Sequence, residues 1–61
     1  MEKRFGVFWA DYMGWDFNSC IGKFDSYEEA EACKEHYYNF EEIDEEEYIV
    51  VYDFLEEKEY I

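Results

Sequence analysis

The strongest strand pattern in the chain is Tyr48-Ile49-Val50-Val51-Tyr52-Asp53-Phe54-Leu55. These residues are mostly β-branched or aromatic, the types that are enriched in strands. The segment before it, 41–47, holds six acids in seven residues and is predicted to be a loop. Two outcomes are open after the strand: it runs on to Tyr60, or residues 56–61 fray into an acidic tail.

A second aromatic segment lies near the N-terminus, at residues 4–12. Both of its faces are apolar, with Phe5, Val7 and Trp9 on one side and Phe8 and Tyr12 on the other. Such a strand usually lies centrally in a sheet, covered on both sides, or shows one side to a partner. Residues 13–16 offer a turn in which Gly14 can take positive φ. Residues 17–24 are then predicted to form the second, antiparallel strand of a hairpin.

A helix is predicted over residues 27–40. Ser26 precedes Glu29 by three positions, which is the spacing of a capping box. At the helical repeat, one arc of the helix is apolar and is predicted to face the core: Ala30, Cys33, Tyr37 and Phe40. The opposite side is acidic: Glu28, Glu31, Glu35 and Glu42. No glycine ends the pattern, so the helix is expected to stop somewhere near 39–42.

The order β-β-α-β predicts an α+β fold in a single domain, residues 1–61. A right-handed crossover through the helix makes the third strand parallel to the second, and therefore antiparallel to the first. The expected sheet has three strands in the order 2-1-3. One helix covers only one face of such a sheet, so the opposite face is expected to show aromatic side chains to solvent or to a partner.

Composition limits the function classes. The chain has 61 residues, with 18 acids against 5 bases, for a net charge of −13, and 25% of it is aromatic. The aromatic content favours a folded domain over a disordered one. A domain of this size buries only about 60% of the surface that its unfolded chain exposes, so a deep cleft is not expected. We therefore predict that the protein is not an enzyme.

The charge and the lack of targeting patterns indicate a compartment and a kind of partner. No apolar run approaches the roughly 20 residues of a membrane span, and the N-terminal segment lacks a signal-peptide pattern, so a cytoplasmic protein is expected. The negative field would repel nucleic acid and phospholipid surfaces. The field is uneven, because residues 1–40 hold 8 acids and 4 bases whereas residues 41–61 hold 10 acids and one base. A basic partner protein is expected.

Cofactors and metals are not expected. Cys33, His36 and the distant Cys20 would need a fourth ligand to hold zinc, and a Cys–His nucleophile is disfavoured because Cys33 lies in the core arc. Residues 41–47 lack the glycine and the alternating pattern of an EF-hand loop. The two cysteines are expected to be free thiols. A single disulfide between Cys20 and Cys33 is the alternative, and it requires the helix to pack over the strand before it.

The acidic residues are the first candidate binding site. A compact 61-residue domain is about 27 Å across. Duplex DNA of that length carries roughly 16 phosphate charges, so a net charge of −13 is close to its charge density. The carboxylates predicted to stand in for phosphates are Glu28, Glu31, Glu35, Glu42, Asp44, Glu45, Glu46 and Glu47.

In this respect the chain resembles the small acidic inhibitors encoded by bacteriophages and mobile elements that mimic nucleic acid, including anti-CRISPR, anti-restriction and DNA-glycosylase inhibitors. The resemblance lies in the helix glutamates, the run 41–47, and Glu56, Glu57 and Glu59 within one compact domain. It implies a non-enzymatic inhibitor that occupies the basic nucleic-acid-binding surface of a host defence protein or another DNA-binding protein.

The alternative is an interaction module whose uncovered sheet face binds another protein or a second copy of itself. Charge would then serve mainly solubility. The candidate aromatic anchors are Trp9, Tyr12, Trp15, Tyr48, Tyr52 and Tyr60. The β-β-α-β order with an acidic helix is also similar to small phage inhibitors of host RNA polymerase.

Overall fold

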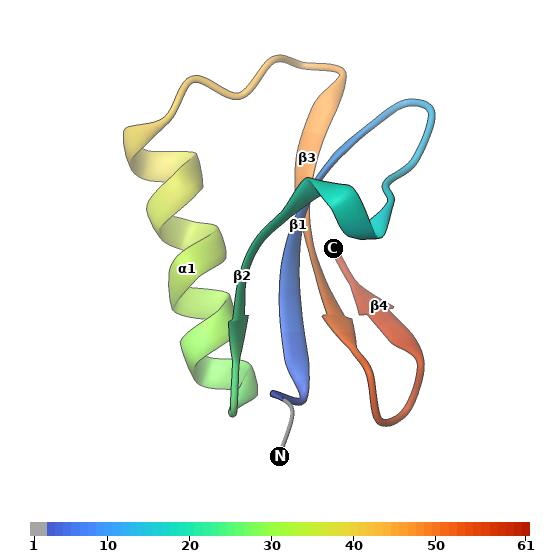
Figure 1. Ribbon diagram of the computed structural model, residues 1–61. Helices are drawn as coiled ribbons and strands as arrows, with labels where there is room; N and C mark the ends of the chain where they lie inside the picture. The colour runs from blue at the N-terminus through green and yellow to red at the C-terminus, as the bar shows by residue number, and fades with distance from the viewer. Residues whose placement is uncertain (1–2) are drawn as a thin grey trace.

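The computed structural model describes residues 3–61, and in it one helix packs on an antiparallel sheet, an α+β fold (Figure 1). Within these residues the sheet has four strands in the order β2-β1-β3-β4. In chain order the elements are β1 (Phe5–Asp11), the 3₁₀ turn η1 (Phe17–Ser19), β2 (Cys20–Phe24), α1 (Tyr27–Phe40), β3 (Glu47–Asp53) and β4 (Lys58–Tyr60).

β1 is a central strand, as its two apolar faces predicted. It pairs with β3 along its whole length, from Phe5 opposite Asp53 to Asp11 opposite Glu47. Its pairing with β2 shifts register after Val7, so that β2 carries an extra residue there. The predicted order 2-1-3 is confirmed for the first three strands.

The C-terminal segment corrects the prediction of three strands. Residues 56–61 are neither a frayed tail nor a continuation of β3, because the chain turns after Asp53 and returns as β4 along β3. The turn was missed because it contains none of the usual residues: Glu57 takes the positive φ of 53° that glycine or asparagine normally supplies.

A buried carboxylate organises this turn. Asp53 is 1% exposed and accepts hydrogen bonds from Arg4 Nε at 3.0 Å and Nη2 at 2.8 Å. It also accepts from the backbone N–H of Leu55 and Glu56. The Arg4 hydrogen bond lowers the pKa of Asp53 from 3.8 to about 2, against the opposite effect of burial and with help from the two backbone N–H groups. The Arg4–Asp53 ion pair thus joins the turn to the start of β1, together with a hydrogen bond from the Phe54 N–H to the Arg4 carbonyl at 2.8 Å.

Asp53→Asn should destabilise the protein at neutral pH, and its deficit should shrink in acid. The native pKa lies below the unfolded one, so the charged carboxylate stabilises the fold above the unfolded pKa of 3.8 and loses this effect as the pH falls through about 2. Thermal melts of both proteins from neutral pH to about pH 2 test this. Asp25→Asn, which removes an exposed partner of Lys3, is the control with little expected effect. A deficit that is constant with pH would contradict the prediction.

The other element boundaries confirm the predicted ends of the helix and correct the predicted starts of two strands. The predicted N-cap is confirmed: Ser26 Oγ accepts from the Glu29 N–H at 3.3 Å, while the Glu29 carboxylate accepts from the Ser26 hydroxyl; α1 ends within the predicted range. The second strand, however, begins at Cys20 rather than at residue 17. Asp16 accepts hydrogen bonds from two backbone N–H groups and starts η1 instead. Glu47, predicted to lie in the loop, is the first residue of β3.

The core between α1 and the sheet is formed by Phe5, Val7, Ala30, Ile49 and Val51. Cys33 and Tyr37 pack against it as predicted. Phe40 does not, because 73% of it is exposed and its ring lies 4.8 Å from that of His36. Phe40 lies at the edge of the apolar arc in the last turn of α1, where a small rotation carries a side chain into solvent.

A second core covers the face of the sheet away from α1. Phe8, Ala10 and Val50 are buried there. The loop between β1 and β2 folds over this face, and the Trp15 ring stacks on Phe8 with 4.5 Å between centroids. The face predicted to be bare is therefore partly covered by the chain itself.

Gly6→Ala should destabilise the protein by about 1–3 kcal/mol through overpacking of this second core. A Cβ at Gly6 would lie 2.7 Å from the Phe8 ring and 2.8 Å from the Phe54 ring. Gly22→Ala is the matched control on the neighbouring strand, since its Cβ would meet Phe24 at 3.3 Å. Urea unfolding of both variants measures the difference, and equal losses would contradict the prediction.

Candidate functional site

Two loops meet at one end of the sheet. The loop after β1 and the loop between α1 and β3 lie at the same end of the molecule, where Asp11 pairs with Glu47 (Figure 1). Together they line an open hollow of about 480 Å³. We call this region the acidic end and define it by its lining residues: Asp11, Tyr12, Asp44, Glu45, Glu46 and Glu47.

The acidic end is anchored at both sides by hydrogen bonds. Glu47 accepts from Trp9 Nε1 at 2.5 Å, and its backbone N–H donates to the Asp44 carbonyl at 2.9 Å. Asp11 accepts from the Met13 backbone N–H at 2.9 Å. Between these fixed points, the side chains of residues 44–46 are exposed. The region therefore presents several carboxylates to solvent on a short, tethered loop.

No lysine or arginine among residues 3–61 compensates this charge locally. Lys3 pairs with Asp25, and Arg4 pairs with Asp53. Lys23 and Lys58 lie on strands opposite Gly6 and Asp53, at the far end of the sheet. The remaining base, Lys34, pairs with Glu31 on the helix. The charges are thus segregated along the molecule, and the negative potential is concentrated at the acidic end.

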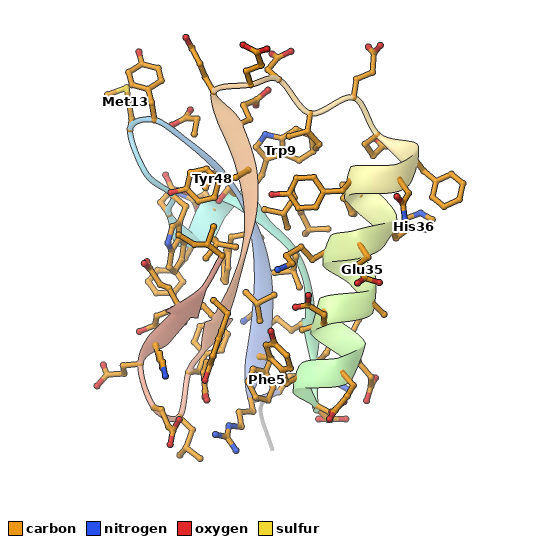
Figure 2. The ribbon with its side chains drawn as sticks, turned by 180° about the vertical axis from the view of Figure 1, so that it is seen from behind. Phe5, Trp9, Met13, Glu35, His36 and Tyr48 are labelled. Carbon is orange, nitrogen blue, oxygen red and sulfur yellow. The ribbon has the colours of Figure 1, made fainter. Side chains whose placement is uncertain are left out.

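Two exposed apolar side chains lie at the same end of the molecule as these carboxylates. Tyr12 is 78% exposed and Met13 is 81% exposed, at the tip of the loop after β1. Figure 2 shows Met13 at the same end of the molecule as the loop before β3. The predicted anchor Tyr12 is therefore accessible, and Met13 was missed because nothing in the sequence places this loop beside residues 44–47.

The predicted acidic set is spread over two places. Glu42 and the residues 44–46 are exposed in the loop, and Glu28 and Glu35 are exposed on the outer side of α1. Glu31 differs from these, because it lies 3.4 Å from Lys34 and one of its oxygens is buried without a hydrogen-bond partner. Glu31 is therefore the least accessible of the helix glutamates in this set.

The predicted aromatic anchors lie on both faces of the sheet. Trp9 lies between the sheet and α1, with its ring edge-on to Tyr37 at 6.0 Å (Figure 2). Tyr60 also faces α1, against Tyr27. These two are thus not on the face away from the helix. That face carries the half-buried anchors Trp15, Tyr48 and Tyr52.

A second hollow, of about 550 Å³, lies on this face beside the loop after β1. We call it the aromatic hollow and define it by its lining: Met13, Gly14, Trp15, Asp16, Phe17, Tyr52 and Glu59. Trp15 Nε1 donates to Glu59 Oε1 at 2.6 Å, which ties the loop to β4. Phe17 is 65% exposed. The sequence placed Phe17 in the second strand and left Glu59 either in an extended third strand or in a frayed tail, so neither prediction brought the two residues together.

The cysteines and histidine do not form a reactive cluster. Cys33 packs in the core under α1, where burial raises the pKa of its thiol, whereas Cys20 packs on the opposite face of the sheet. Both are free thiols, and the sheet separates them. Within residues 3–61, no three His, Cys, Asp or Glu side chains are arranged to hold a metal ion. In the same part of the chain, no helix is long and apolar enough to span a membrane.

Comparison of the chain with protein-family models, curated proteins and solved structures gives no significant match. The functional proposal therefore rests on the chemistry of the acidic end and of the aromatic hollow.

Proposed function

We propose that this protein is a non-enzymatic, cytoplasmic inhibitor that mimics nucleic acid and occupies the basic nucleic-acid-binding surface of a host defence protein or another DNA-binding protein. The observation that carries this proposal is the segregation of charge: the acidic end and the loop before β3 lack any compensating lysine or arginine among residues 3–61. Small acidic phage-type inhibitors, which the sequence resembles, act in this way.

The dimensions support the proposal. The longest axis of the molecule measures 34 Å, and duplex DNA of that length carries about 20 phosphates. The net charge of −13 is therefore about two-thirds of the charge on the same length of duplex. A cationic groove that binds this surface gains charge pairing and counterion release similar to those it gains from nucleic acid.

Apolar anchors beside the carboxylates add affinity that charge alone does not supply. Tyr12 lines the acidic end together with residues 44–47, Met13 follows it at the same end of the molecule (Figure 2), and both are among the most exposed apolar side chains. An aromatic ring can occupy a position where the partner normally stacks a base, and methionine adapts its shape to irregular pockets.

Salt dependence should distinguish mimicry from apolar docking. The immobilised protein is incubated with bacterial lysate, and the retained proteins are identified by mass spectrometry. Their affinity should fall by more than about tenfold between about 50 and 200 mM salt. Duplex DNA added as competitor should displace them. Retention that is insensitive to both salt and DNA would overturn the proposal.

The second candidate function is a protein interaction module, such as an inhibitor of host RNA polymerase or a subunit of a small complex. The aromatic hollow favours it, because Phe17 is largely exposed and lies beside Trp15 and Tyr52. In that case Phe17→Ala should weaken binding more than neutral replacements in the loop 41–47, and binding should survive high salt.

A further inference from the structure

We propose that the aromatic hollow is a binding site for the guanidinium group of an arginine side chain on a partner protein. This site goes beyond the function proposed above, because it requires only that the partner is a basic protein with an exposed arginine. The partner need not bind nucleic acid. The proposal rests on three features of the hollow: its aromatic walls, its carboxylates, and a cation already present on the same ring cluster.

Three rings form the walls at steep angles to one another. The centroid of Trp15 lies 5.4 Å from that of Phe17 and 5.2 Å from that of Tyr52, with interplanar angles of 86° and 56°. Phe17 and Tyr52 meet at 80°. The rings therefore make a corner rather than a flat stack. A planar cation placed in such a corner can contact one ring face while its N–H groups point elsewhere.

Two carboxylates complete the lining. Glu59 Oε1 accepts from the Trp15 indole at 2.6 Å, and Asp16 Oδ1 accepts from the backbone N–H groups of Asn18 and Ser19. These bonds fix the positions of both carboxylates and use one oxygen of each. An apolar partner would desolvate these charges without pairing them, at a cost. A cation both stacks on the rings and pairs with the carboxylates, so charge complementarity selects it.

The ring cluster already contacts one cation of this chain, the exposed Lys23. Lys23 Nζ lies 5.5 Å from the centroid of Phe54, and Phe54 in turn contacts Tyr52 and Phe17. The same cluster thus binds a cation at one side and presents open ring surface at the hollow. Arginine fits better than lysine, because guanidinium is planar, less strongly hydrated and able to bond a carboxylate with two N–H groups.

The test follows the indole N–H resonances by NMR during titration with three probes: the N-acetyl amides of arginine, lysine and citrulline. Trp15 should shift saturably with the arginine probe, and the citrulline probe, which is neutral and nearly isosteric, should bind at least about fivefold more weakly. Trp9, which donates to Glu47 of the acidic end, reports binding of a cationic probe at that end, so its shifts are fitted separately and should give a different dissociation constant. Equal responses of Trp15 to arginine and citrulline would overturn the proposal.

Two variants locate the site. Phe17→Leu keeps an apolar side chain but removes the ring, and Glu59→Gln keeps an acceptor for Trp15 while removing the charge. Each should weaken the arginine probe by about two- to fivefold. Glu57→Gln, which makes the same charge change outside the hollow, should leave its affinity unchanged; an equal loss would overturn the proposal. Because these titrations use no nucleic acid or host protein, the arginine site can fail while the proposed mimicry stands, and the reverse also holds.

Discussion

Phe8→Ala should lower the free energy of unfolding by about 3–5 kcal/mol. Phe8 is fully buried at the centre of the second core, where its ring contacts Trp15, Phe17 and Phe54. Truncation removes these contacts and leaves a cavity that the surrounding rings fill only in part. A domain of 61 residues has a total stability of about 3–9 kcal/mol. The loss is therefore at least about a third of the total, and it should be seen as a lower urea midpoint and as weaker aromatic circular dichroism.

Phe40→Ala is the matched control for this prediction. It makes the same chemical change at a side chain that is 73% exposed, so its effect should stay within about 0.5 kcal/mol. Phe8→Leu, which keeps most of the apolar volume, should cost about 1 kcal/mol. If the alanine variants at positions 8 and 40 lost equal stability, the second core would not be the one described. The comparison matters because the helical periodicity alone placed Phe40 in the core.

The parts of the fold that could be predicted have strong local causes. The N-cap Ser26 fixes the start of α1 through contacts within four residues. The two apolar faces of residues 4–12 require a central position, which sets the order of the first three strands. The fourth strand was not predictable in the same way, since its turn depends on the distant Arg4 that holds Asp53 and on a glutamate at positive φ.

The candidate site, like the fold, could be predicted from the sequence only in part. The acidic run 41–47 is visible in the composition, so its exposed loop could be predicted. Its neighbours Asp11 and Met13 could not, because they reach it only through the pairing of β1 with β3. The side on which Trp9 lies was also open, since an apolar residue suits either face of a strand covered on both sides. In each case the missing information was which residues meet through tertiary contacts.

Neutralising the acidic end should weaken binding to the basic partner more than any other change of the same net charge. In the triple variant Asp44→Asn, Glu45→Gln, Glu46→Gln, three exposed carboxylates are lost while Glu47 keeps its bond to Trp9. If all three stand in for phosphates, the slope of log affinity against log salt should become less steep by about 2–3. The measurement is the affinity for the captured partner at several salt concentrations, with association rates recorded separately because charge acts strongly on them.

The control triple, Asp25→Asn, Glu29→Gln and Glu57→Gln, also removes three exposed carboxylates, none of them among the predicted stand-ins for phosphates, and brings the net charge from −13 to −10, but leaves the acidic end intact. It should retain most of the affinity and most of the salt slope, because exposed charges farther away than about 8–10 Å are largely screened at physiological ionic strength. Equal losses in the two triples would mean that net charge, and not its concentration beside Tyr12 and Met13, governs binding. Unchanged affinity in both would contradict mimicry itself and leave the apolar surfaces as the binding sites.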